Sequence, residues 1–326
     1  MLTRRSLLAA FASLTSGSAG AQDLANRSFP TRPITVVVPY PAGGPVDVTA
    51  RLIAHSVGDA LGQPILVDNR SGGAGVIGSV AVARAEPDGH TLILGTNQTH
   101  ATNQNLLKNC PYDAVTDFSP VAGVTDIQHV LVVRRGLEVA DTAALVALAK
   151  QSPGRLNYAS TGVGSAAHLA GELFKTRAGV DLQHIPFRGS APLLTELLAA
   201  RVDLSFATLP SVVSSIEAGT VRALAVASAT RAARLPSLPT LAEAGVPGVE
   251  ADAWFALFAP AKTPAAIIDA IHRAVSASLS SEAAREAIIK QGMTLRLRPP
   301  AEIAAWLPGE VAKWATVIKA AGVTAE

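Results

Sequence analysis

Residues 33–47 read PITVVVPYPAGGPVD, and this stretch decides which fold to expect. The β-branched run Ile34–Val38, bounded by prolines, predicts a buried strand. The proline- and glycine-rich residues 39–45 predict a turn. Apolar residues then recur at helical spacing from Val46 to Leu61, and Gly62 ends the pattern. The stretch therefore predicts a strand, a tight loop and a helix in succession.

The same order of strand, loop and helix recurs along the chain. Further strands are expected at residues 65–67, 91–94, 130–133, 156–159, 185–187, 204–206, 221–228 and 254–259. The C-terminal part should be helical at 264–279, 281–291 and 300–321, with Pro308 kinking or splitting the last helix. Alternating strands and helices predict an α/β fold with a parallel sheet covered on both faces. The 326 residues are enough for two such domains.

Glycine- or serine-rich turns between a strand and a helix recur at residues 40–47, 71–76, 160–165 and 188–192. The first turn of a helix has unpaired N–H groups and a partial positive charge, so it can hold an anion without a lysine. In an open α/β sheet such loops gather at the carboxyl ends of the strands, where ligands bind. One such loop is more often just the turn that a β/α unit needs. Several in one chain favour an anion-binding cleft.

Individual side chains near these loops allow more than one interpretation. Asp47 could orient its loop or bind an ammonium group, or simply complement the positive end of its helix. His168 could donate to a ligand carboxylate, or act as a packing or capping residue. Arg188 could pair with an anion at the mouth of a cleft, or lie solvated on the surface. Cys110, the only cysteine, is expected to have a packing role.

Motif spacing argues against several other functions. The seven histidines show neither H-E-x-x-H nor H-x-H spacing, so we expect no metal site and no cofactor. Residues 162–167 match G-x-G-x-x-A, but the next strand ends at Arg188 rather than at the acid that a dinucleotide site needs. Neither G-x-S-x-G nor a partnered S-x-x-K motif is present. A hydrolase site assembled from distant loops stays open.

Residues 1–21 read as an export signal. Arg4 and Arg5 precede a short apolar stretch, and residues 19–21 read A-G-A, so cleavage after Ala21 and a periplasmic location are expected. Both the twin-arginine and the general secretory route stay open. The chain has 27 basic and 25 acidic residues, and loss of a signal with two arginines and no acid leaves a formal charge of zero. This balance gives no sign of a nucleic-acid partner.

Short motifs are spread along the predicted mature chain. They include PITVVVPYPAGGPVD at 33–47, LGQP at 61–64, PDGHTL at 87–92, PYD at 111–113, LNYAS at 156–160, HLAGE at 168–172 and GSAP at 189–192. As a set they resemble the Bug/TctC family, the extracytoplasmic solute receptors of tripartite tricarboxylate transporters. The resemblance implies a type II periplasmic-binding-protein fold, with two Rossmann-like lobes joined by two crossover strands. Lobe 1 would comprise residues 22–130 and 255–326, and lobe 2 residues 131–254.

The resemblance also implies a binding site between the lobes. A small carboxylate, such as a di- or tricarboxylate or an acidic amino acid, would be held there by backbone amides and hydroxyls. The first-lobe residues implied are Tyr40, Ala42, Gly43, Gly44 and Asp47, aided by Thr96 and Asn97. The second-lobe residues implied are Ser160, Thr161, Gly162, Gly164, Ser165 and His168, aided by Gly189, Ser190 and Asp203.

The function that the resemblance implies is that of a non-catalytic, monomeric receptor delivering its ligand to membrane permease subunits. A receptor that presents the ligand to a membrane sensor kinase would have the same site, and an exported hydrolase is the third alternative. Residues 206–208 read FAT, whereas relatives often carry an acid and an amide there, which weakens any transfer of ligand identity. Pro308-Gly309 also departs from the family pattern, with consequences for shape.

Overall fold

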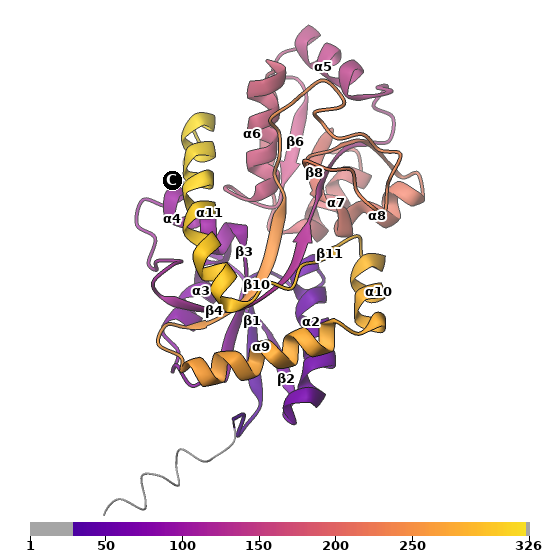
Figure 1. Cartoon of the computed structure of the whole chain (residues 1–326). Coiled ribbons are helices and arrows are strands. Elements are labelled where there is room, and N and C mark those ends of the chain that lie inside the picture. Colours follow the sequence, from indigo (N-terminus) through magenta and orange to yellow (C-terminus); the bar gives the residue numbers. More distant parts are fainter. Residues whose placement is uncertain (1–28, 324–326) are drawn as a thin grey trace, which may run out of the picture.

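The computed structural model describes residues 29–323 and shows two lobes, each built around its own β-sheet (Figure 1). The expected export signal lies outside the described residues. The strands of the first lobe are β1 (Ile34–Val38), β2 (Ile65–Asn69), β3 (Thr91–Thr96), β4 (Phe118–Ile127), β10 (Ala253–Pro260) and β11 (Thr294–Leu295). They form one sheet in the order β11-β4-β10-β3-β1-β2.

The second lobe has a five-stranded sheet. Its strands are β5 (His129–Arg134), β6 (Asn157–Ser160), β7 (Gln183–Pro186), β8 (Leu204–Thr208) and β9 (Val221–Val226), in the order β7-β6-β8-β5-β9. Alternate residues of β5 belong to different hydrophobic clusters, with Leu131 and Val133 in one and Val130 and Val132 in the other. Both faces of this sheet are therefore buried, as the sequence predicts.

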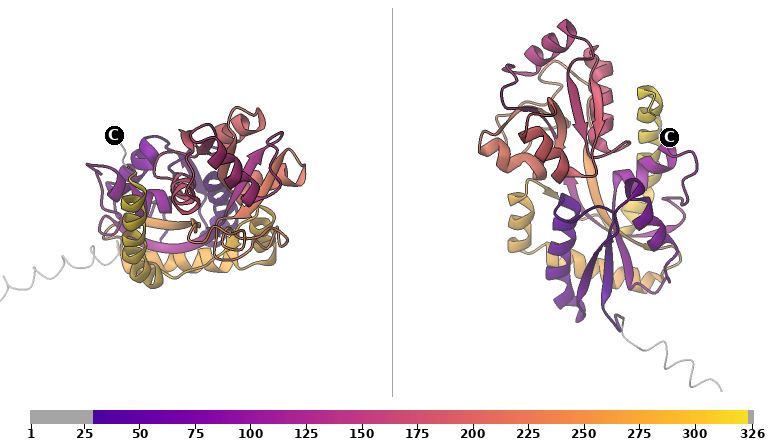
Figure 2. Two further views of the ribbon diagram at one scale, coloured as in Figure 1. Left: turned by 90° about the horizontal axis from the view of Figure 1, so that it is seen from above. Right: turned by 180° about the vertical axis from the view of Figure 1, so that it is seen from behind.

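Helices pack against the sheets (Figures 1 and 2). Those of the first lobe are α2 (Pro45–Leu61), η1 (Gly73–Gly75), α3 (Val76–Ala83), η2 (Gln98–Thr102), α4 (Asn103–Leu106), α9 (Ala265–Leu279), α10 (Glu282–Lys290) and α11 (Pro300–Ala321). Those of the second lobe are α5 (Thr142–Gln151), α6 (Ala166–Ala178), α7 (Ser190–Leu198) and α8 (Leu209–Glu217). Helix α2 begins with Pro45, whose fixed φ suits a first helical position. It ends at Gly62, whose φ of 66° is left-handed.

Strand directions correct part of the prediction. Strands β2 and β3 lie parallel to β1, and β7 and β8 lie parallel to β6, as β/α repeats require. Strand β10 instead pairs antiparallel with β3 and β4, and β5 pairs antiparallel with β8 and β9. The expectation of purely parallel sheets is wrong for β5 and β10, because each enters its sheet from the other lobe.

The chain passes between the lobes at two adjacent places. Gln128 joins β4 to β5, and residues 227–252 join β9 to β10. Gln128 Nε2 donates to Ser228 Oγ at 3.2 Å and to the carbonyl of Thr230 at 3.0 Å. The two crossover segments are thus hydrogen-bonded to each other.

The sheets suggest lobe boundaries slightly different from those implied by the resemblance. A boundary between residues 130 and 131 falls inside β5, which pairs within the second sheet from His129 onward. A boundary after Trp254 falls inside β10, which pairs within the first sheet from Ala253 onward. We therefore propose divisions at Gln128 and just before Ala253.

The last helix is not split. Helix α11 continues through Pro308 from Pro300 to Ala321, so of the two expected outcomes, a kink or a split, the split is wrong. It starts in the first lobe and runs alongside the second, where it contacts α6 (Figures 1 and 2). It therefore adds a contact between the lobes away from the crossover.

Candidate functional site

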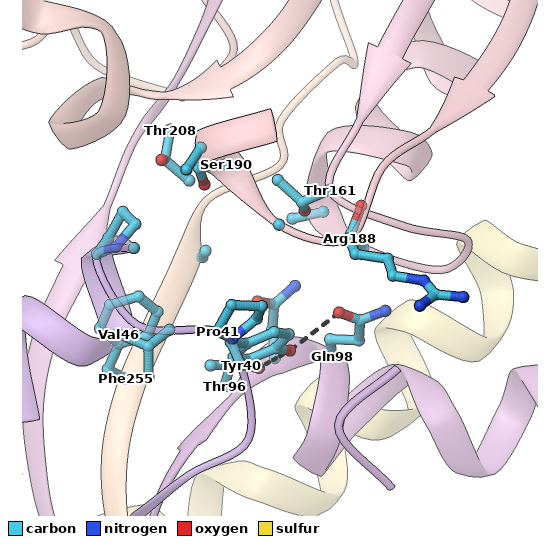
Figure 3. A pocket seen from close by; sticks show the side chains of 18 of the residues that line it. Tyr40, Pro41, Val46, Thr96, Gln98, Thr161, Arg188, Ser190, Thr208 and Phe255 are labelled. Carbon is cyan, nitrogen blue, oxygen red and sulfur yellow. Dashed lines mark hydrogen bonds between the residues drawn. The ribbon is translucent and has the colours of Figure 1, made fainter. Parts of the chain in front are cut away.

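An interlobe pocket lies where the carboxyl ends of β1, β3, β6 and β8 face one another (Figure 3). It contains about 680 Å³ not filled by protein atoms, part of it open to solvent. Loops of both lobes and the crossover residues His129 and Ala253 line it. The position matches the strand-end crevice expected for an α/β fold.

Three helices begin at this pocket. They are α2 from the first lobe and α6 and α7 from the second, of 17, 13 and 9 residues. The first-turn residues Val46, Ala166 and Ala191 line the pocket, and none of their N–H groups donates to a described residue. The three helix termini therefore supply hydrogen-bond donors and partial positive charge from both sides.

Asp47 holds the first-lobe loop in shape. Its carboxylate accepts from the Gly43 amide and from Arg51 Nε, both at 3.0 Å, and from Asn69 Nδ2 at 3.0 Å. Asn69 also donates to the carbonyl of Tyr40 at 3.2 Å. Burial acts to raise the pKa of Asp47, but these hydrogen bonds outweigh it and lower the pKa below its usual value. Asp47 thus orients the loop and does not line the pocket.

His168 has the corresponding role in the second lobe. Its Nδ1 accepts from the Gly164 amide at 3.0 Å, and its ring stacks on that of His184 with 3.9 Å between centroids. His184 Nε2 lies 2.7 Å from Ser160 Oγ, which also bonds to Gly162. Burial lowers the pKa of both histidines to about 4, so both are neutral near pH 7. His168 shapes the loop and does not line the pocket.

The lobes contact each other beside the pocket. Tyr40 donates to Gln98 Oε1 at 2.9 Å, and Gln98 Nε2 donates across to the carbonyl of Val163 at 3.0 Å. Thr102 Oγ1 donates to the carbonyl of Gly164, also across the lobes, at 3.0 Å. Figure 3 shows Tyr40 and Gln98 joined on the first-lobe side of the pocket. The structure is therefore a closed arrangement of the lobes.

The charge of the pocket suits an anion. Arg188 is the only lysine or arginine among the described residues that line it, and no aspartate or glutamate is among them. Arg188 is exposed and forms no ion pair with a described residue. Val46 and Phe255 form an apolar wall on the opposite side (Figure 3). The pocket thus has a cationic side and an apolar side.

Nine of the residues implied by the resemblance line the pocket together. These are Tyr40, Ala42, Gly44, Thr96, Asn97, Thr161, Ser165, Gly189 and Ser190. Five others, Gly43, Asp47, Ser160, Gly164 and His168, lie in or support the same loops without lining it. Gly162 lines an adjacent hollow on the other side of Gln98.

Asp203 lies apart from the pocket. It directly precedes β8, at the end of that strand opposite Thr208. Its carboxylate pairs with Arg134 at 2.9 Å and accepts from the Asn157 amide at 3.0 Å. Asp203 therefore joins strands and does not face the pocket.

Sequence reasoning missed several lining residues. Gln98, His129, Thr208 and Phe255 line the pocket but were not among the implied binding residues. Gln98 directly follows Thr96 and Asn97, so its position offered a local signal. His129 and Phe255 lie in strands that change lobes, and nothing in their local sequence marks them. Arg188 was weighed from the sequence and does line the pocket.

Among residues 29–323, no group of three or more His, Cys, Asp or Glu side chains is arranged to hold a metal ion. No helix in the same range has the length and apolarity needed to span a membrane.

Two lobes, paired crossovers and a pocket between them define a solute-binding protein of the periplasmic type. Residues 49–323 match the family model TctC, the tripartite tricarboxylate transporter family receptor. Protein BugT of Bordetella pertussis is 38% identical over 90% of this chain and 91% of its own. The chain belongs to the TctC family, which is a family of receptors rather than enzymes.

Solved structures agree with this assignment. A protein of R. palustris solved with adipate has a TM-score of 0.88 and 40% identity, covering 91% of this chain and 99% of its own. MatC from Rhodopseudomonas palustris, solved with bound malate, has a TM-score of 0.84 and 34% identity, covering 89% of this chain and 100% of its own. The fold is thus that of TctC-type receptors.

Proposed function

We propose that this protein is an exported receptor that captures a small carboxylate in the interlobe pocket and delivers it to a tripartite tricarboxylate transporter. The observation that carries the proposal is the meeting of three helix N-termini, from both lobes, at a pocket that residues 29–323 line with one arginine and no acid. Helix N-termini and arginine both favour a carboxylate. Di- and tricarboxylates and acidic amino acids are the ligand classes we expect.

The relatives support this class of ligand. The R. palustris structure with adipate and the MatC structure with malate each contain a small dicarboxylate. Their similarity to this chain extends over about nine-tenths of its length. Similarity of this extent supports the class of ligand, while the lining side chains set its identity.

Capture would proceed by hinge motion at the crossover segments. In the closed arrangement, Gln98 and Thr102 of the first lobe donate to the carbonyls of Val163 and Gly164 of the second. These contacts stabilise closure only when the lobes approach, so a ligand that touches both lobes shifts the population toward the closed form.

Binding can be tested directly by isothermal titration calorimetry on the purified mature protein. The panel should include adipate, malate, succinate, citrate, aspartate and glutamate. We expect at least one to bind and to raise the melting temperature, because a ligand at 100 times its dissociation constant adds about 2.7 kcal/mol of stability. If the whole panel gives neither heat nor stabilisation, the proposed function is wrong.

Export and delivery need separate tests. N-terminal sequencing of the protein from the periplasm should begin at Gln22 if cleavage follows Ala21. Co-purification with the membrane permease subunits, stronger with ligand than without, would support delivery. We expect a monomer by light scattering.

A further inference from the structure

An adjacent hollow lies beside the interlobe pocket, and both lobes line it. It contains about 1110 Å³ not filled by protein atoms, part of it open to solvent. Its first-lobe side includes residues 71–74, from a glycine-rich turn that does not line the interlobe pocket, and its second-lobe side includes Val163 and Phe187. The residues that line both spaces are Tyr40, Pro41, Gln98, Thr161 and Arg188. The two spaces therefore adjoin along these residues.

Gln98 spans the gap between the lobes at this boundary. Its side-chain amide is held at both atoms, because Tyr40 donates to Oε1 at 2.9 Å and Nε2 donates to the carbonyl of Val163 at 3.0 Å. The residue is only 4% exposed. Figure 3 shows Gln98 on the side of the pocket where Arg188 lies. To swing aside, this side chain must give up one or both hydrogen bonds, so in the closed arrangement it acts as a fixed partition.

The adjacent hollow has the chemistry to receive the end of a longer carboxylate. Leu106, Leu107 and Phe187 offer apolar surface to methylene groups. Arg188 is the one lysine or arginine among the described residues that line the hollow, and no aspartate or glutamate is among them. Each methylene group buried in such a space adds about fourfold to the affinity. The Gln98 side chain is what separates this space from a ligand held at the three helix N-termini.

We propose that Gln98 is a specificity-determining residue that sets the maximum length of the carboxylate ligand, by separating the interlobe pocket from the adjacent hollow when the lobes close. The inference rests on the proposed function and deepens it, since it concerns the length of the ligand. A linear dicarboxylate that fits between the helix N-termini and Gln98 binds, whereas a longer one meets the Gln98 side chain. A small residue at position 98 would join the two spaces.

A series of linear dicarboxylates from succinate to suberate, each longer by one methylene group, tests the length limit in calorimetry. We expect the affinity of the wild-type protein to pass through a maximum and then fall. In Gln98→Ala the maximum should move to a longer member, with a gain of about fourfold, relative to the wild-type optimum, for each methylene group admitted. Tyr40 keeps Thr96 Oγ1 as a hydrogen-bond partner at 3.0 Å, so this substitution does not leave its hydroxyl unpaired.

Thr102→Val is the matched control, because Gln98→Ala also removes a bond between the lobes. Thr102 donates to the carbonyl of Gly164, as Gln98 does to that of Val163, but Thr102 lines neither space. Thr102→Val should therefore weaken every dicarboxylate by about fivefold and leave the preferred length unchanged. Gln98→Ser is a second small variant, and melting temperatures check that each variant folds.

The outcomes separate the length limit from the proposed function. The assignment is wrong if the folded Ala and Ser variants prefer the same length as the wild type, or if Thr102→Val shifts the preference equally. It is also wrong if the wild-type affinity keeps rising to suberate. Binding of citrate, aspartate or glutamate without binding of any linear dicarboxylate overturns the length limit and leaves the proposed function standing. Absence of binding by all of these ligands overturns both.

Discussion

Replacing Gly164 by alanine should weaken ligand binding by blocking closure of the lobes. Gly164 lies in the second lobe with a φ of 77°, and a Cβ placed on it would overlap Cδ2 of Leu106 in the first lobe. Leu106 also lines the hollow beside Gly162, so rotation of its side chain into that space relieves part of the overlap. With Leu106 in its present rotamer, an ordinary carbon–carbon contact requires the lobes to separate here by more than about 1 Å, and this case sets the upper limit of the effect.

The size of the effect follows from the bonds that this separation breaks. The contacts from Gln98 to Val163 and from Thr102 to Gly164 are both 3.0 Å, and an added ångström takes both beyond hydrogen-bonding distance. At about 1 kcal/mol each, their loss disfavours the closed form by about 2 kcal/mol. A ligand that binds the closed form should then bind about 30-fold more weakly.

Gly179→Ala is the matched control. Gly179 is in the same lobe, has a φ of 63° and has no atom within 4 Å of its added Cβ. Both variants incur the cost of a left-handed alanine, about 1–2 kcal/mol, but only Gly164→Ala meets the other lobe. Calorimetry would give the affinities, with the best ligand of the carboxylate panel, and urea denaturation the stabilities. Equal affinities of the two variants would refute this account of closure.

Three other substitutions test the site and its supports. Arg188→Gln should reduce carboxylate affinity about tenfold at low salt and less at high salt, while the exposed Arg135→Gln, outside the pocket, should leave it unchanged in calorimetry. Asp47→Asn should cost about 1–3 kcal/mol of stability in urea denaturation, because the first-lobe loop loses an acceptor; an unchanged midpoint would contradict this role. His184 has its pKa lowered to about 4, so unfolding takes up a proton between about pH 6.5 and 4 and stability falls as pH drops through that window. His184→Gln should make this fall less steep in urea denaturation, and an identical pH profile would exclude a contribution from His184.

The sequence by itself determined the local units. The run from Ile34 to Val38, the loop before Pro45 and the stop at Gly62 depend on β-branching, fixed φ and left-handed glycine, which are properties of neighbouring residues. The loops that border the pocket could be predicted for the same reason, since each is a short segment before a helix. Nine of the sixteen residues implied by the resemblance do line the pocket.

Only the tertiary structure decided which way the supporting side chains face. Asp47 and His168 lie in the predicted loops, yet both bond to backbone amides there and shape the pocket without lining it. His129 and Phe255 join the site because strands β5 and β10 cross between lobes and pair antiparallel with strands distant in sequence. Such pairings are fixed by burial and hydrogen bonds across the whole sheet. A run of apolar residues does not by itself specify which strand it will pair with.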